Sequence, residues 1–272
     1  MPIITFTSDF GLNDAYAGVV HGVIAGIAPQ ARVIDLTHGI PAQDVRAGAL
    51  ALYAACPYFP DQTIHLAVVD PGVGTQRRAL LLRTARYWYV GPDNGLFGLV
   101  APPDSLLGCW DLTHSRYQLP SVAATFQGRD LFGPVAAHLA TGVPPEELGT
   151  PTASPLALSS VVVCVVRPGE TIGTVLYVDH FGNLVTNLGA SADWQESVAQ
   201  RQVAGWLDGR PLRPARAYAE PALWSGAPHQ PELLLLAGSA GLLEVAVTNG
   251  SAAQTTGLNV GATVRVVITR SH

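Results

Sequence analysis

The first half of the chain alternates short apolar runs with longer segments of helical periodicity, and this alternation constrains the fold more than any other feature. In residues 15–28, apolar side chains recur at helical spacing and stop before Pro29. Strands separated by helices are typical of an α/β layer, so we expect an α/β N-terminal domain with a mainly parallel sheet. The expected strands are 3–7, 33–36, 63–69, 79–84 and 88–90, and the expected helices are 15–28, 45–55 and 131–140.

The second half has a different texture. Residues 142–160 are rich in proline, threonine, serine and glycine, and we interpret them as a linker. The short β-rich runs beyond it predict a small antiparallel barrel or sandwich, and residues 195–231 show no clear period. We therefore divide the chain into residues 1–150, the α/β domain, and residues 160–272, the β domain. The expected strands of the β domain are 160–166, 171–178, 184–186, 233–237, 243–247 and 263–268.

Composition excludes several classes of function. The net charge of −5 gives no electrostatic footprint for nucleic acid or for a membrane surface, so we expect neither as a partner. The sequence contains no lysine, which rules out Schiff-base chemistry and a P-loop. No apolar stretch reaches the roughly 18 residues of a membrane span, and the N-terminus lacks the basic region of a signal peptide.

The three cysteines are far apart and suit neither a zinc site nor a disulfide framework. We expect Cys56, Cys109 and Cys164 to be small core residues in a reduced, cytoplasmic protein. The eight histidines are dispersed. The sequence shows no HxH or HExxH motif and no spacing of two histidines with a carboxylate, so we expect no catalytic metal.

The best candidate for chemistry is the stretch 68–78, where an apolar run stops at Asp70, turns through two glycines and presents Arg77 and Arg78. A carboxylate at the end of a buried strand can be held ionised and oriented by a nearby guanidinium. The alternative is a strand end followed by a surface ion pair. Asp9 follows another expected strand, so both carboxylates are expected in one crevice at the carboxyl edge of the sheet.

Three further segments carry candidate polar groups. Residues 126–130 are expected to open a helix whose free amides could face a ligand, with Gln127 orienting a water or substrate. Residues 91–95 read as a tight turn. Residues 179–183 offer a carboxylate, an aromatic face and an amide, which could bind an ammonium group and a purine, although a β-turn explains them equally well.

Taken together, these segments resemble one family, the S-adenosyl-L-methionine (SAM) hydroxide adenosyltransferases, or SAM hydrolases, which are related to the SAM-dependent fluorinase and chlorinase. The matching motifs run in family order across nearly the whole chain. They are TSDFG at 7–11, DLTH at 35–38, VDPGVG at 69–74, GPDNG at 91–95, GRD at 128–130, DHFGN at 179–183, SAGLLE at 239–244 and NGSAA at 249–253.

The resemblance implies a C-terminal β-barrel and a homotrimer, with SAM bound between the N-terminal domain of one subunit and the C-terminal domain of a neighbour. The substrate, SAM, is converted to adenosine and methionine, and no cofactor is implied. By motif position, Asp70, Arg77 and Gln127 are the catalytic residues. The implied substrate-binding residues are Asp9 (ribose), Asp179 and Ser239 (methionine), Asn183 and Asn249 (adenine edge), Phe181 and Tyr218 (adenine face), with Asn94 and Gly128 beside them.

The sequence departs from the family pattern at Gln127, where the family phrase Phe-His-Gly-Arg-Asp has histidine. A glutamine can hydrogen-bond water but cannot relay a proton. We therefore expect a SAM hydrolase, with a non-catalytic SAM- or adenosine-binding protein as the alternative. A halogenase is a third possibility that the Asp70 carboxylate disfavours, because the halogenating relatives carry an aromatic residue there and a carboxylate repels a halide.

Overall fold

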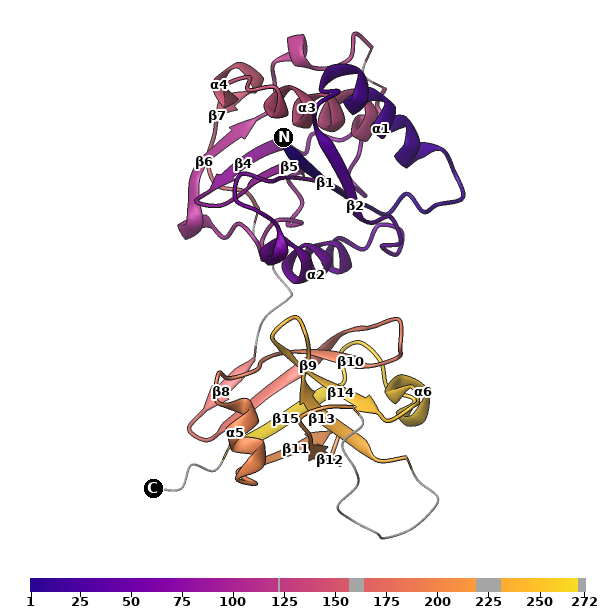
Figure 1. Ribbon diagram of the computed structural model, residues 1–272, viewed down its shortest axis with the longest axis vertical. Helices are drawn as coiled ribbons and strands as arrows, with labels where there is room; N and C mark the ends of the chain where they lie inside the picture. Colours follow the sequence, from indigo (N-terminus) through magenta and orange to yellow (C-terminus); the bar gives the residue numbers. More distant parts are fainter. Residues whose placement is uncertain (122, 157–163, 219–230, 269–272) are drawn as a thin grey trace. The chain divides into compact units, whose positions relative to one another are not determined.

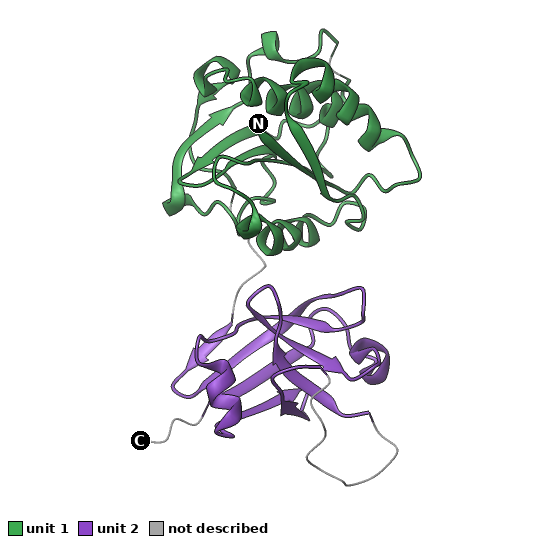
Figure 2. Cartoon of the chain, viewed as in Figure 1, with its two compact units in different colours: residues 1–159 green, residues 160–272 purple. Residues whose placement is uncertain are grey.

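The computed structural model describes residues 1–121, 123–156, 164–218 and 231–268 (Figure 1). The chain forms two compact units, Met1–Ser159 and Ser160–His272, which Figure 2 shows in different colours. Each unit has its own hydrophobic core. Among the residues described, no helix has both the length and the apolar character needed to cross a membrane.

The described part of unit 1 is built on a mixed seven-stranded sheet. The four strands β2, β1, β3 and β5 run parallel, whereas β4, β6 and β7 pair antiparallel. In spatial order the strands are β2 (Arg32–Thr37), β1 (Ile3–Ser8), β3 (Ile64–Val68), β5 (Trp88–Pro92), β4 (Ala79–Thr84), β6 (Leu106–Asp111) and β7 (Thr150–Pro151).

The expectation of a mainly parallel sheet is therefore wrong. β4 ends at Thr84 and β5 begins at Trp88, and a connection this short joins only antiparallel neighbours, because a parallel pair needs a crossover of a dozen or more residues. The order β5-β4-β6 then extends the sheet with antiparallel strands.

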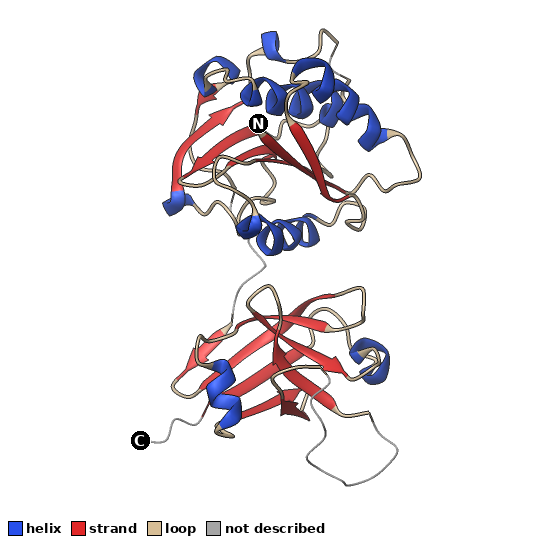
Figure 3. Ribbon diagram, viewed as in Figure 1, coloured by secondary structure: helices blue, strands red, loops and turns tan. Residues whose placement is uncertain are grey.

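Helices cover both faces of this sheet (Figure 3). Side chains alternate along β3, so that Leu66 and Val68 pack with α1 and α3 while Ala67 lies in the core on the α2 side.

The start of α2 is capped by Asp44, whose carboxylate accepts a hydrogen bond from the Ala47 amide at 2.9 Å. The helices are α1 (Tyr16–Ile27), α2 (Val45–Ala55), α3 (Gly133–Ala140) and α4 (Pro145–Leu148), with short 3₁₀ turns η1 (Cys56–Tyr58), η2 (Pro103–Ser105) and η3 (Ser115–Tyr117) and a π turn η4 (Gly128–Phe132).

The segment interpreted as a linker, 142–160, belongs in large part to unit 1. It contains α4 and β7, and β7 pairs with β6. The buried Asp93 also accepts a hydrogen bond from the Leu156 amide at 2.7 Å. The proline-rich composition therefore reflects a short helix and turns attached to the sheet; residues 157–160 lie outside the described part.

Unit 2 is a closed barrel of seven strands, with β8 as an additional edge strand. The ring closes where β9 pairs with β10, and β12 and β13 form the single parallel pair among the strand pairs that the structure describes in this unit. The strands are β8 (Val165–Arg167), β9 (Glu170–Val178), β10 (Leu184–Gly189), β11 (Val203–Leu207), β12 (Arg210–Pro214), β13 (Leu233–Ala237), β14 (Leu242–Val247) and β15 (Thr263–Ile268).

The part of the sequence without a clear period, 195–231, holds most of α5 (Trp194–Ala199) and all of β11 and β12. Prolines at 211 and 214 interrupt the alternation in β12, which is why the strand is hard to recognise. The helix α6 (Ala252–Thr256) follows β14. Of the strand expected at 160–166, residues 160–163 lie outside the described residues.

The cysteines differ from one another. Cys56 and Cys109 are buried in unit 1 as expected, and burial raises the pKa of the Cys56 thiol to about 12 and that of Cys109 to about 11. Cys164 is only partly buried and packs against the edge of the unit 2 core, so the expectation holds for it only in part. The two buried thiols are therefore protonated packing residues.

Candidate active site

Asp70 lies just beyond the carboxyl end of β3, the strand flanked by β1 and β5. The chain turns there: the Val73 amide donates to the Asp70 carbonyl at 3.2 Å, and the Thr75 hydroxyl donates to the Gly72 carbonyl at 2.7 Å. This turn brings Arg77 back toward Asp70. A buried strand end and a tight turn therefore place a carboxylate and a guanidinium face to face.

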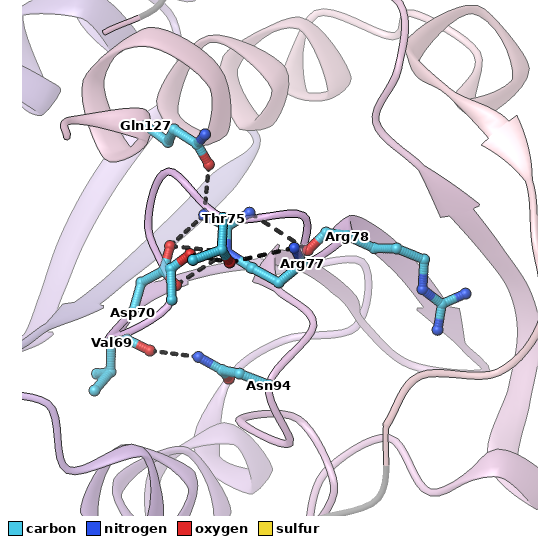
Figure 4. Close-up of polar contacts among 8 residues, drawn as sticks. Val69, Asp70, Thr75, Arg77, Arg78, Asn94 and Gln127 are labelled. Carbon is cyan, nitrogen blue, oxygen red and sulfur yellow. Dashed lines mark hydrogen bonds and ion pairs between the residues drawn. The ribbon is translucent and has the colours of Figure 1, made fainter. Parts of the chain in front are cut away.

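Asp70 and Arg77 form an ion pair that is almost completely buried (Figure 4). The Arg77 Nε donates to Asp70 Oδ1 at 3.0 Å and to Oδ2 at 3.1 Å, and Nη2 also donates to Oδ2. Only 5% of the Asp70 side chain and 11% of the Arg77 side chain are exposed. The guanidinium also lies over the Phe132 ring, 5.2 Å from its centroid. The pair is thus fixed in orientation and shielded from solvent screening.

Gln127 completes this group, because Arg77 Nη2 donates to Gln127 Oε1 (Figure 4). Arginine has only donors, so the amide must turn its oxygen to the guanidinium and leave its Nε2 free to donate elsewhere. The three residues expected to be catalytic therefore meet in one network. Gln127 contributes a hydrogen-bond donor to the site and holds Arg77.

The loop that carries Gln127 is fastened by the buried Asp130. Its carboxylate accepts from the Ala123 amide at 2.7 Å and from Arg129 Nε at 2.5 Å and Nη2 at 2.9 Å. The Arg129 hydrogen bond lowers the pKa of Asp130 below its usual range, although burial opposes the shift. Asp130 is therefore a positioning residue for the 123–130 loop.

The helix start at 128–132 differs from the expectation of free amides. It is a π turn, and the amides of Arg129 and Asp130 both donate to the Phe126 carbonyl, at 3.1 and 3.2 Å. These two donors are already used within the chain. Single π turns inside helices occur often at functional sites.

Asp9 follows β1, which is the parallel neighbour of β3 with Ser8 opposite Val68. Asp9 and Asp70 therefore leave the same edge of the sheet from adjacent strands, as the sequence predicts. Asp9 Oδ2 accepts a hydrogen bond from the Gln43 amide at 2.7 Å. The second oxygen has no hydrogen bond from the described residues.

Aromatic packing joins the Asp9 loop to the Gln127 loop. Phe10 contacts Phe126 edge to face, with ring centroids 5.7 Å apart, and Tyr16 contacts both rings. A Cβ at Gly128 would lie 3.0 Å from the Phe10 ring, so glycine is the residue that allows this approach. Gly128 acts here through packing against the loop that holds Asp9.

Asn94 has a local role in the structure. Its Nδ2 donates to the Val69 carbonyl at 2.8 Å (Figure 4), and its Oδ1 accepts from the Leu96 amide at 3.2 Å. Both ends of the amide thus tie the 91–95 turn to the residue before Asp70. This geometry supports positioning of Asp70.

In unit 2, residues 179–183 form a tight turn after β9. Asp179 Oδ1 accepts from the amides of Phe181 and Asn183, at 2.9 and 2.8 Å, and Oδ2 accepts from Asn183 Nδ2 at 2.9 Å. Phe181 is 74% exposed, so its ring is available for stacking. The β-turn reading and the binding reading are therefore compatible in one structure.

The 179–183 turn packs against the turn that contains Asn249. Gly182 has a φ of 83°, and a Cβ there would lie 2.0 Å from Ser251 Oγ. Asn249 also has a positive φ, 53°. Both turns therefore use backbone conformations that most side chains disfavour, and their close packing brings Asn183 and Asn249 into one region of unit 2.

The Tyr218 hydroxyl donates a hydrogen bond to Glu244 Oε1. Glu244 is the last residue of the 239–244 motif, and the sequence alone gives it no role. Glu244 is buried, and desolvation raises its pKa, while the Tyr218 hydrogen bond opposes the shift. In the sequence, Glu244 stands out as the acidic residue in the otherwise apolar strand β14. Ser239 lies in the connection from β13 to β14.

One cluster of possible metal ligands is not visible as a sequence motif. His21, Asp35 and His38 come together in space, with their ligand atoms within 4.8 Å of one another. Because His21 is on α1 and the other two are at β2 and just after it, no sequence spacing revealed the group.

The chain is similar throughout to proteins of one family. The model of the SAM hydroxide adenosyltransferase N-terminal domain matches residues 4–149, and that of the C-terminal domain matches residues 173–265. A protein named (R)-S-adenosyl-L-methionine hydrolase from Thermus thermophilus is 43% identical over 97% of this chain and 99% of its own. A Salinispora tropica protein of the same name is 42% identical over 97% of each chain.

More distant relatives and solved structures agree. A fluorinase from an Actinoplanes species is 26% identical over 69% of this chain and 72% of its own. The crystal structure of an uncharacterized conserved protein from Thermotoga maritima has a TM-score of 0.87 at 34% identity, covering 97% of this chain and 99% of the other. The crystal structure of a conserved hypothetical protein from Thermus thermophilus has a TM-score of 0.77 at 39% identity, covering 98% and 100%.

Proposed function

The chain belongs to the SAM hydroxide adenosyltransferase family, and we propose on this premise that Asp70, Arg77 and Gln127 form the centre at which it hydrolyses SAM. The products are adenosine and L-methionine. The names of the relatives specify the (R) form of the sulfonium, and we extend this preference to the present chain.

The reaction forms a bond from a water oxygen to the ribose C5′ and breaks the bond from C5′ to sulfur, whose electron pair stays on sulfur. Methionine leaves as a neutral thioether, so no general acid is needed. The water loses one proton, which Asp70 accepts directly or passes to solvent. The remaining task is to hold a poorly solvated water in line with the C5′–S bond.

The hydrogen bonds of the network are consistent with a separate role for each of the three residues. Asp70 has two oxygens with about four lone-pair positions, and Arg77 occupies only part of them, so the carboxylate can still accept from a water. Arg77 fixes the carboxylate in orientation. Gln127 Nε2 can donate to the same water and so restrict its position.

The observation that carries the proposal is the buried Asp70–Arg77 pair at the end of β3. We expect Asp70→Asn to lower kcat by at least about 10²-fold, the lower end of general-base contributions, while SAM binding measured by calorimetry changes little. The amide keeps the size of the side chain. An Asp70→Asn protein that hydrolyses SAM at the wild-type rate would refute the assignment.

The other assignments are proposals of the same kind. Asp9 would hold the ribose hydroxyls with the oxygen that Gln43 leaves unused. Asp179 and Ser239 would bind the methionine end, Asn183 and Asn249 would read the adenine edge, and Phe181 and Tyr218 would flank the adenine face. We also propose a cytoplasmic homotrimer that needs no cofactor. Retention of full activity after dialysis against a chelator would support the last point.

The substrate groups proposed for unit 1 and for unit 2 are complementary. Asp9 and the Asp70 network belong to unit 1, whereas the turn at 179–183 and Tyr218 belong to unit 2. We propose that a complete site combines unit 1 of one subunit with unit 2 of another. Three apolar side chains near the Asp9 loop are exposed and available for such an interface: Leu12, Tyr16 and Val19.

A further inference from the structure

Two histidines and a carboxylate meet on one side of the β1–β2 edge. His21 Nε2 lies 2.8 Å and His38 Nε2 lies 3.2 Å from the same Asp35 oxygen, Oδ1. The three side chains come from α1, from β2 and from the residue just after β2. The arrangement is therefore a product of the tertiary fold.

His38 is held so that its Nε2 points into this cluster. Its Nδ1 is 2.8 Å from the Ser8 hydroxyl, which also accepts from the Phe10 amide at 3.2 Å. Only 3% of the His38 side chain is exposed, and its Nε2 has no partner in hydrogen-bond geometry among the described residues. A buried ring nitrogen without a hydrogen bond is costly, and a bound ion beside Asp35 would satisfy it.

The Ser8 contact provides what a metal-bound histidine requires. When Nδ1 carries the proton and donates it to Ser8 Oγ, the lone pair is on Nε2, facing Asp35. Phe6 packs edge to face on the His38 ring, with centroids 4.7 Å apart, and lies 6.0 Å from the His21 ring. The orientation of the His38 ring is thus fixed before any ion binds.

The spacing from each histidine to Asp35 also fits one ion, and the ligand atoms of all three residues lie within 4.8 Å of one another. Ligand atoms about 2.0–2.2 Å from a common metal are roughly 2.8–3.5 Å apart at the usual coordination angles. The two separations to Asp35 Oδ1, 2.8 and 3.2 Å, lie in this range. His21 and Asp35 are 35% and 43% exposed, so water can reach the remaining coordination positions.

We propose that His21, Asp35 and His38 bind a divalent transition-metal ion of the Zn²⁺ and Co²⁺ class. Two imidazoles and one carboxylate suit such ions, whereas Mg²⁺ and Ca²⁺ prefer oxygen ligands alone. The ion ties α1 and β2 to the end of β1 through His38 and Ser8. None of its three ligands belongs to the Asp70 network, so its role is to stabilise the edge from which Asp9 projects.

The test is a titration of tag-free, metal-stripped protein with Co²⁺, followed by visible d–d absorption and by calorimetry. We expect one equivalent to bind, with affinity reduced at least about tenfold in His21→Ala and in Asp35→Asn. The control is His114→Ala, which removes another exposed histidine, one whose Nδ1 bonds only to the Glu147 carbonyl in the described structure.

Binding also has a folding readout that does not depend on turnover. Zn²⁺ should raise the Tm of the wild type and of His114→Ala, and raise that of His21→Ala much less. Absence of stoichiometric Co²⁺ binding, or equal affinity in His21→Ala and wild type, would show a plain histidine–aspartate ion pair and overturn the proposal. Failure here leaves the assignment of Asp70 untouched, since the two sets of residues are tested separately.

Discussion

At the residue scale, Asp70 is oriented through both carboxylate oxygens by Arg77, and Arg77 is oriented in turn by Gln127. The Gln127 Oε1 accepts a hydrogen bond from the guanidinium, so the amide offers the site only its Nε2 donors. In the proposed mechanism, proton acceptance therefore falls to Asp70 alone. We accordingly propose that hydrolysis depends on the alignment of water more than on a proton relay.

Replacing Gln127 with histidine tests this division. Gln127→His introduces a side chain that can accept and release protons near neutral pH, so we expect kcat to rise, by up to about 10²–10⁴-fold, and to gain a pH dependence. Steady-state rates of wild type and variant across a pH series provide the measurement. A wild type that binds SAM without turnover, alongside an active variant, would instead support the non-catalytic binding protein.

Glu244 gives a prediction about stability. Its pKa is raised from 4.5 by burial, so the folded state keeps the proton to higher pH than the unfolded state does. The free energy of unfolding should therefore fall as the pH rises from about 4.5 through the folded pKa. Glu244→Gln, which keeps an oxygen for Tyr218, should lose this slope. Urea denaturation at several pH values measures it, and parallel curves for the two proteins would contradict the assignment.

At the element scale, functional side chains leave the ends of strands and are fixed by turns. Asp9 and Asp70 follow β1 and β3, and the turn at 179–183 follows β9. These turns were readable because an apolar run ending in Asp, Gly and Asn is a strong local signal. The antiparallel half of the unit 1 sheet is not predicted from the sequence. The short gap between 84 and 88 nevertheless indicates it, because so short a connection joins only antiparallel strands.

Contacts between elements were harder to predict. His21, Asp35 and His38 meet only when α1 packs beside β2, and Tyr218 reaches Glu244 only when β12, β13 and β14 lie side by side. The strands β11 and β12 are not predicted from the sequence, because prolines interrupt the pattern of this segment. Local pattern predicts where a chain turns, whereas tertiary packing decides which turns share a site.

The turn of unit 2 can be tested through Gly182. Gly182→Ala puts a Cβ at a φ of 83° and 2.0 Å from Ser251 Oγ, so the two packed turns must separate. We expect a loss of about 1–3 kcal/mol in the free energy of unfolding, together with weaker SAM binding. Gly189→Ala is the matched control, because a Cβ there meets nothing within 4 Å. Equal stability of both variants would show that the turns do not need this close contact.

At the scale of the whole molecule, the candidate residues are divided between two units with separate cores. The proposed inter-subunit site takes residues from both units. The family models cover both units in the same order, at 4–149 and 173–265.

Mixed oligomers test the shared site. Asp70→Asn disables unit 1 and Asp179→Ala disables unit 2, so each protein alone should be nearly inactive. If a site combines units from different subunits, unfolding and refolding the two variants together should create some intact sites and restore a fraction of wild-type activity. Light scattering gives the subunit number. Mixtures no more active than the separate variants, despite mixed oligomers, would contradict a site shared between subunits.

In the proposed mechanism, water attacks the ribose C5′ of SAM at the Asp70 centre. The decisive experiment incubates the purified protein with SAM in ¹⁸O-labelled water and analyses the products by mass spectrometry. We expect methionine and adenosine carrying one ¹⁸O at the 5′ position, formed by the wild type and almost absent with Asp70→Asn. Unchanged SAM in the presence of protein that binds it, or adenosine without the label, would refute the mechanism.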